Sequence, residues 1–130
     1  MENQEDMLLE DMSEFTIEAA RDMMRKALKR IERAEDWIQG VAARDYEGVP
    51  VNASNPQACK FCSIGALHAD HDGSHYEDIR NAAYALLAKQ TDSAPYLSSF
   101  SKIINWNDAA VRTHGEVVAA FKAAIEGGNE

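Results

Sequence analysis

The sequence lacks any apolar run that approaches the ~20 residues of a membrane-spanning helix. Its first residues are acidic, and they lack the basic and then apolar pattern of a secretory signal. Cysteine is scarce, and in a reducing cytoplasm Cys59 and Cys62 are more readily explained as thiols or metal ligands than as a structural disulfide. We therefore expect a cytoplasmic protein with no membrane association.

Basic residues are also scarce, with 13 Lys and Arg against 22 Asp and Glu and a formal net charge of -9. Phosphate binding needs a basic face, so we expect no direct binding to nucleic acid. Two interpretations of the acidic charge remain. It keeps the protein soluble, or it engages a basic protein partner, for example by imitating nucleic acid.

The remaining composition predicts one folded domain. Apolar residues make up 45% of the 130 residues, which suits a modest core. Residues 1–12 are interpreted as an acidic N-terminal arm and residues 13–130 as a single helical domain. We predict an all-α fold, a compact bundle of about five helices with one long N-terminal helix and a long irregular loop.

The long helix is predicted from Ser13 or Thr16, either of which caps its first turn, to a stop at Gly40. Apolar residues recur along it at alternating steps of three and four, which makes one continuous face. A basic stripe follows the opposite side, either as a solvated face or as a docking strip for an acidic partner or for the chain's own arm. The apolar face consists of Ile17, Ala20, Met24, Ala27, Ile31, Ala34 and Ile38, and the stripe of Arg21, Arg25, Lys29 and Arg33.

Turn-forming residues dominate 41–60, which predicts a long loop with a short extended piece beside Pro50. Further helices are predicted at 62–69, 74–90 and 96–106. Thr113 and Glu116 have the spacing of a capping box, so they begin a last helix that Gly127 ends.

Three sequence blocks resemble those of a family of small uncharacterised domains in bacteria and their phages. They are W-x-Q-G at 37–40, C-x-x-G-A-L at 62–67 and W-N-D-x-x-x-R-T-x-x-E-V at 106–117. The resemblance covers most of the chain after Thr16. It implies a compact helical fold in which the three blocks meet in space, and it supplies no established activity.

The third block and Trp37 provide the candidate binding residues. We predict that they form a buried polar network that fixes the arrangement of the helices. In this network Arg112 pairs with Asp108 or Glu116, and the two tryptophans pack together. The alternative is a small ligand pocket between Trp37, Cys62 and Trp106. The candidate binding residues are Trp37, Trp106, Asn107, Asp108, Arg112 and His114.

Two other sets of side chains carry alternative chemistry, and neither is favoured. Cys62, His114 and Asp108 have the residue types of a cysteine-dependent enzyme, in which a histidine activates a thiolate at a helix N-terminus. A tetrahedral zinc site is the second alternative, although its gap between cysteine and histidine is shorter than in a zinc finger. Its ligands would be Cys59, Cys62, His68 and His71. We expect no cofactor and no bound metal.

The whole sequence leads us to expect a small acidic helical protein that acts by binding a protein partner. The family resemblance implies an accessory protein of a phage or prophage that binds and modulates a host or viral protein. The alternative is an enzyme that uses Cys62 and His114. The enzyme requires Cys62 exposed in a cleft beside His114, whereas a binding module buries Cys62 against Gly65 and the long helix.

Overall fold

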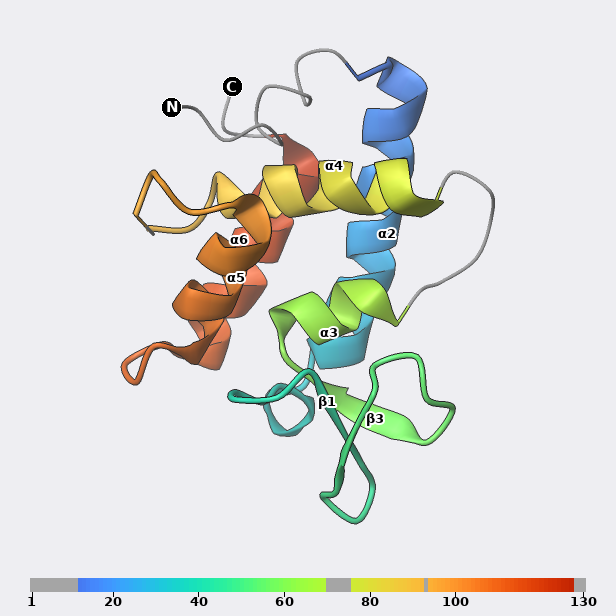
Figure 1. Ribbon diagram of the computed structural model, residues 1–130, viewed down its shortest axis with the longest axis vertical. Helices are drawn as coiled ribbons and strands as arrows, with labels where there is room; N and C mark the ends of the chain where they lie inside the picture. The colour runs from blue at the N-terminus through green and yellow to red at the C-terminus, as the bar shows by residue number, and fades with distance from the viewer. Residues whose placement is uncertain (1–11, 70–75, 93, 128–130) are drawn as a thin grey trace.

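The computed structural model describes residues 12–69, 76–92 and 94–127, so most of the predicted arm at 1–12 lies outside the described residues (Figure 1). The described chain is mostly helical, and none of its helices is long and apolar enough to cross a membrane. In chain order the elements are α2 (Glu14–Ile31), the 3-10 helix η1 (Ala34–Asp36), β1 (Ala43–Asp45), β2 (Pro50–Val51), β3 (Ala58–Phe61), α3 (Ser63–His68), α4 (Tyr76–Ala88), α5 (Ser99–Asp108) and α6 (His114–Glu126).

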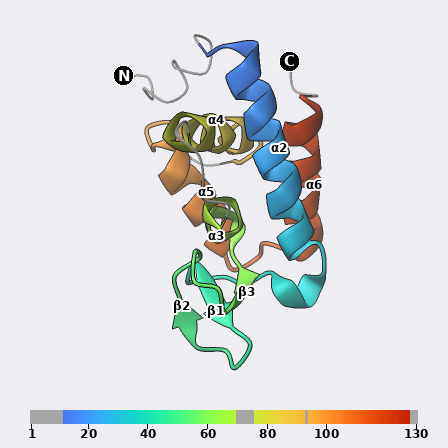
Figure 2. The same ribbon diagram turned by 90° about the vertical axis from the view of Figure 1, so that its right-hand side faces the viewer.

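The helices pack around one another, and the strands lie at one end of the molecule. Helices α2 and α6 lie side by side, α4 crosses α2, and α5 packs against α4 (Figures 1 and 2). The short helix α3 contacts both α2 and α5 and follows β3 directly. The N-terminal end of α3 therefore stands at the junction between the sheet and the helices, which is where the candidate site is built.

The prediction of a purely all-α fold is wrong, because a small antiparallel sheet interrupts the helices. Its strand order is β2-β1-β3, and Ala43 in the central strand pairs with both Val51 and Phe61. Pro50 has no N–H for the ladder, and it lies in the edge strand β2, as an extended piece beside a proline must. The strands have only two to four residues, which is too short for an alternating pattern to appear in the sequence.

The long N-terminal helix is shorter than predicted, because α2 ends at Ile31. Residues 33–38 instead form η1 and an extended segment. Tertiary contacts compete with the helix there: the Ile38 N–H donates to the Phe61 carbonyl at 3.0 Å, and Trp37 forms an isolated parallel bridge with Phe61. The helical spacing of apolar residues continues past Ile31, but these contacts to β3 prevail over it.

The helices predicted at 74–90 and 96–106 are present as α4 and α5, with shifted ends. Positions 74 and 75, where the first of them was expected to begin, lie outside the described residues. Helix α5 begins after its N-cap Ser98, whose side chain accepts a hydrogen bond from the Ser101 N–H at 3.2 Å. Tyr96 and Leu97 therefore lie in the preceding loop, whereas the sequence predicted them inside the helix.

Three predicted helix caps are confirmed, whereas the predicted stop at Gly40 is wrong, because α2 ends at Ile31. The Ser13 side chain accepts from the Thr16 N–H at 3.1 Å at the start of α2. Thr113 and Glu116 form the complete capping box of α6. Gly127 ends that helix with φ of 66°, a left-handed conformation that favours glycine.

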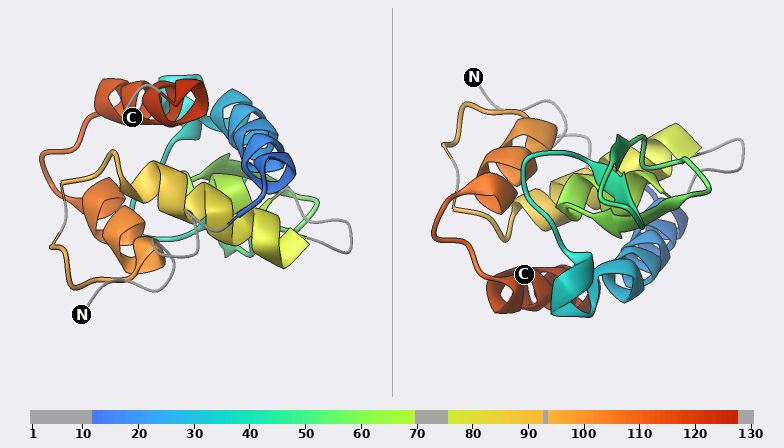
Figure 3. Two further views of the ribbon diagram at one scale, coloured as in Figure 1. Left: turned by 90° about the horizontal axis from the view of Figure 1, so that it is seen from above. Right: turned by 90° about the horizontal axis from the view of Figure 1, so that it is seen from below.

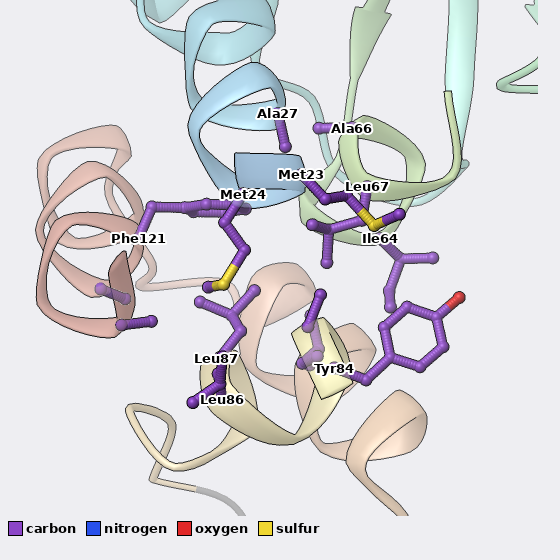
Figure 4. Packing of buried hydrophobic residues seen from close by; sticks show 14 of the residues in the cluster. Met23, Met24, Ala27, Ile64, Ala66, Leu67, Tyr84, Leu86, Leu87 and Phe121 are labelled. Atoms are coloured by element: carbon purple, nitrogen blue, oxygen red, sulfur yellow. The ribbon is translucent and has the colours of Figure 1, made fainter. Parts of the chain in front are cut away.

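The core lies where α2, α4 and α6 meet. Met24, Leu87 and Phe121 come from these three helices and have no exposed surface (Figure 4). Burial of each such side chain contributes roughly 1.5–3 kcal/mol. Ala27 of α2 and Ala66 of α3 are also fully buried, and their small size lets the two helices approach closely (Figure 4).

Three residues of the predicted basic stripe, Arg21 and Arg25 of α2 and Arg33 just after it, are paired with acidic residues close by in the chain. Arg21 and Arg25 both reach the Glu18 carboxylate, at 3.9 and 3.3 Å. Arg33 lies 2.8 Å from the Glu35 carboxylate. Exposed pairs of this kind add little stability, but they offset the positive charge of the stripe. The pairing favours a solvated face over a docking strip for an acidic partner.

Candidate functional site

Asn107 is the centre of the candidate site, and its side chain is fully buried at the end of α5. Its Oδ1 accepts from the indole Nε1 of Trp37 at 2.7 Å, and from the backbone N–H and hydroxyl of Ser63 at 3.0 and 2.7 Å. Its Nδ2 donates to the Ile38 carbonyl at 3.2 Å and to Oδ1 of Asp108 at 2.9 Å. One amide therefore ties α5 to the start of α3 and to the segment after η1.

The W-x-Q-G segment holds the end of α5 through two further contacts. Gln39 Nε2 donates to the carbonyls of Asn107 and Ala109 at 2.8 and 2.9 Å, and carbonyls at a helix end have no partner within the helix. The N–H of Gly40 donates to Oδ1 of Asp108 at 3.1 Å. Gly40 has φ of 91°, which a residue with a side chain rarely adopts. The structure therefore brings all three sequence blocks together around Asn107.

Arg112 pairs with Glu116 and stacks on Trp106. Its Nη1 lies 3.2 Å from Oε1 of Glu116, and its Nε donates to the Trp106 carbonyl at 2.8 Å. The guanidinium carbon lies 4.4 Å from the centre of the Trp106 ring, within the range of a cation–π contact. The N–H of Thr113 and then Arg112 lower the pKa of the Glu116 carboxyl below its ordinary value. These contacts hold the turn between α5 and α6.

His114 connects the first turn of α6 to the end of α2. Its Nε2 lies 2.7 Å from the carbonyl oxygen of Ile31, which is among the last carbonyls of α2 and has no partner within the helix. Its ring lies against Trp37, with centroids 6.2 Å apart. The predicted packing of the two tryptophans is therefore wrong, since Trp37 contacts His114 and Trp106 contacts Arg112.

Cys62 is the N-cap of α3 and is only 7% exposed. Its Sγ accepts from the Gly65 N–H at 3.3 Å, and its own N–H donates to the Ala42 carbonyl at 3.1 Å. Burial raises the pKa of the Cys62 thiol, and the negative charge of Asp108 raises it further. Within the described part of the chain, no hydrogen bond joins Cys62 to His114. This environment favours the protonated thiol over an activated thiolate.

The two cysteines are therefore expected to differ in reactivity. Cys59 is exposed, whereas Cys62 is buried and its thiol has a raised pKa. Because the thiolate is the nucleophile, iodoacetamide near neutral pH should modify Cys59 at least about tenfold faster than Cys62 in the folded protein. Cleavage after Lys60 separates the two cysteines, so mass spectrometry of tryptic peptides measures both rates. Equal rates would indicate an accessible Cys62 thiolate and would favour the cysteine-dependent enzyme.

The described residues of the zinc alternative, Cys59, Cys62 and His68, differ in their surroundings. Cys59 is exposed, Cys62 is buried, and the ring of His68 stacks against Tyr84 with centroids 6.1 Å apart. His71 lies outside the described residues. In residues 12–69, 76–92 and 94–127, no three His, Cys, Asp or Glu side chains form a group that could hold a metal ion.

Trp106 and Arg112 also line a cavity of about 330 Å³, formed with the end of α5 and the chain that leads into it. The predicted pocket was placed between Trp37, Cys62 and Trp106, and of these only Trp106 lines this cavity. The sequence prediction missed the other lining residues, because they come from separate stretches of the chain and meet only in the folded protein. They are Asp92, Ala94, Tyr96, Leu97, Asn105 and Ala109.

Ser63 was also missed as a partner of Asn107. A serine at the start of a predicted helix is most simply interpreted as a cap, and this hides its role as a donor to a distant residue.

A model for a family of unknown function, DUF6197, matches residues 16–127 of the chain. A comparison with curated proteins and a comparison with solved structures gave no match. The family match agrees with the resemblance to an uncharacterised domain family.

Proposed function

We propose that this chain, which belongs to the family of unknown function DUF6197, is a small acidic interaction module that binds another protein without catalysis. The observation that carries the proposal is that the polar side chains of the third sequence block, at 106–117, bond to other residues of this chain. The Asn107 amide, the Asp108 carboxylate and the Arg112 guanidinium all bond to other residues of the chain. Catalytic side chains must reach a substrate, whereas these groups hold three segments of the fold together.

Exposed apolar side chains on the loops support a binding role. Tyr46, Tyr96 and Val111 are 84%, 82% and 83% exposed. Tyrosine is enriched at protein interfaces, because one side chain offers a large apolar ring and a polar tip. We propose that a partner covers one or more of these side chains.

The turn that carries Tyr46 is ordered by hydrogen bonds of its own. The Asp45 carboxylate accepts from the backbone N–H groups of Glu47 and Val49, both at 2.9 Å. Arg44 Nη1 donates to the Gly48 carbonyl at 2.7 Å. A turn that is ordered before binding loses less conformational entropy in a complex, so it suits a recognition surface.

The partner we propose is a host or viral protein, and the role is that of a phage or prophage accessory protein. This part of the proposal rests on the resemblance of the three sequence blocks. The net charge of -9 favours a partner with a basic surface. The alternative of a cysteine-dependent enzyme has less support, because Cys62 is buried and Nε2 of His114 is directed to the Ile31 carbonyl.

Site-specific photo-crosslinking tests the proposed function. A photoreactive phenylalanine analogue replaces Tyr46, Tyr96 or Val111, one position per variant, and the tagged protein is recovered from host cells after illumination. We expect a discrete adduct with one protein at one or more of these positions, because their side chains lie on the exposed loops. Lys29 provides the control position, where no adduct is expected. It is exposed on α2, in the basic stripe.

One pair of results would contradict the proposed function. Absence of adducts at all three loop positions, together with an activity that is lost on Cys62→Ser, would replace the interaction module with the enzyme.

A further inference from the structure

We propose that the cavity beside Trp106 holds a basic side chain, a lysine or an arginine, of a partner polypeptide. The inference rests on the proposed function and specifies the chemistry of the partner at one site. The cavity volume of about 330 Å³ is sufficient for one long side chain. The chain that leads from α4 into α5 runs alongside α5 (Figure 3), and residues from both line the cavity.

Three polar side chains that line the cavity are available to a ligand. The Asp92 carboxylate, the Tyr96 hydroxyl and the Asn105 amide make no hydrogen bond or ion pair within the described residues. All three residues are exposed. Two of them offer neutral acceptor oxygens and the third a negative charge, and a lysine or arginine head group can donate to all of them.

Arg112 is the positive charge that lines the same cavity, and its charge is already offset. Its Nη1 pairs with Glu116 at 3.2 Å, its Nε donates to the Trp106 carbonyl, and its flat face lies over the Trp106 ring. The guanidinium is therefore occupied as a donor on one side and stacked on another. With the Arg112–Glu116 pair close to neutral, Asp92 determines the sign of the charge in the cavity.

The apolar part of the lining suits the stem of the same side chain. Leu97, Trp106 and Ala109 line the cavity beside the polar groups. Lysine and arginine place their methylene stems along apolar surface while the charged head remains with polar groups. A small inorganic cation would leave this apolar surface uncovered.

Exposed apolar residues beside the cavity indicate a polypeptide rather than a free amine. Tyr96 lines the cavity and is 82% exposed, and Val111, between the lining residues Ala109 and Arg112 in sequence, is 83% exposed. A small amine that enters the cavity would leave Val111 in water. A peptide with apolar residues on each side of its basic residue would cover both the cavity and this surface.

Titration of the isotope-labelled protein with blocked tripeptides tests the inference by NMR. The probe is leucine–arginine–leucine, and peptides with glutamine or glutamate in the centre are the comparisons. We expect the arginine peptide to shift the amide signals of residues 94, 96, 97 and 105–112 and the indole signal of Trp106. Its affinity should exceed that of either comparison peptide at least about tenfold, and it should fall as salt is added.

A matched pair of variants separates the cavity from the net charge of the protein. Asp92→Asn and Glu126→Gln each remove one negative charge, and Glu126 is exposed on α6 and does not line the cavity. We expect Asp92→Asn to weaken the arginine peptide about fivefold and Glu126→Gln to change its affinity less than about twofold. Equal losses in the two variants would overturn the inference, as would equal affinity for the glutamine peptide.

Two further results would also overturn it. One is the absence of shifts at the cavity with the arginine peptide. The other is propylguanidinium binding as tightly as the tripeptide, since the occupant would then be a small cation. The two proposals can fail separately. Adducts at the loop positions together with no preference for the arginine peptide would remove the cavity inference and leave the interaction module in place.

Discussion

Replacing Asn107 with alanine is expected to lower the free energy of unfolding by about 3–4 kcal/mol. The change removes the acceptor that Trp37 and Ser63 share and the donor to the Ile38 carbonyl. Ser63 is itself fully buried, so its N–H and hydroxyl would lose a partner without gaining water. Each buried polar group left unpaired costs about 1–3 kcal/mol. Urea unfolding followed by circular dichroism measures the loss.

Asn105→Ala provides the matched control in the same helix. Asn105 is exposed and makes no hydrogen bond within the described residues. We expect a change below about 0.5 kcal/mol, with a slight gain because alanine favours helix. A similar loss of unfolding free energy in both variants would show that an asparagine at the end of α5 affects only that helix. Asn107 would then not join α5 to α3 and to the segment after η1.

Gly65→Ala is expected to cost about 3 kcal/mol, for a steric reason. A methyl group on Gly65 would lie 1.9 Å from the carbonyl oxygen of Ala42, which is far inside contact distance. That oxygen accepts the Cys62 N–H at 3.1 Å, so it cannot move away without loss of a bond at the start of α3. The clash with backbone atoms would separate α3 from the segment that enters the sheet. Thermal unfolding of the purified variant tests this expectation.

Gly115→Ala should have the opposite sign. Apart from its chain neighbours and the backbone of its own helix, no atom lies within 4 Å of a methyl group placed on Gly115, in the first turn of α6. The same substitution there should stabilise the protein by about 0.5–1 kcal/mol, because glycine disfavours helix. If Gly65→Ala melts at the wild-type temperature while Gly115→Ala melts at a higher one, the result would contradict the close approach of Gly65 to Ala42.

Local signals in the sequence correctly predicted three of the helix caps. Ser13, the Thr113 and Glu116 pair, and Gly127 act within one helical turn of their own position, so their roles depend little on the rest of the fold. The apolar period identified the buried face of α2 for the same reason. Ala20, Met24, Ala27 and Ile31 are all fully buried.

Features that depend on distant residues could not be predicted in this way. The end of α2 is decided by contacts of Trp37 and Ile38 with Phe61, more than twenty residues further along the chain. The strands are too short for their pairing to show as a pattern. Arg112 pairs with Glu116 and not with Asp108, whose carboxylate accepts from Gly40 and Asn107 instead, and spacing alone does not determine this choice.

The candidate site shows the same division. Sequence reasoning proposed a network around the third block, and the indole of Trp37 is bonded to Asn107. It did not find Ser63, because a serine hydroxyl beside a helix start has a simpler local explanation. The cavity residues Asp92, Tyr96 and Asn105 were missed because they come together only when the loop lies against α5.

The central claim is that Asn107 works as a structural tie between the sequence blocks, and the most direct measurement is a double-mutant cycle with Trp37. Trp37→Phe removes the indole donor that lies 2.7 Å from Asn107 Oδ1 and keeps an aromatic ring beside His114. Unfolding free energies of wild type, Trp37→Phe, Asn107→Ala and the double variant give the coupling. If Asn107 joins the blocks through Trp37, the double variant should lose about 1–2 kcal/mol less unfolding free energy than the sum of the two single losses. Additive losses, within about 0.3 kcal/mol, would contradict the tie and leave Asn107 available to a ligand.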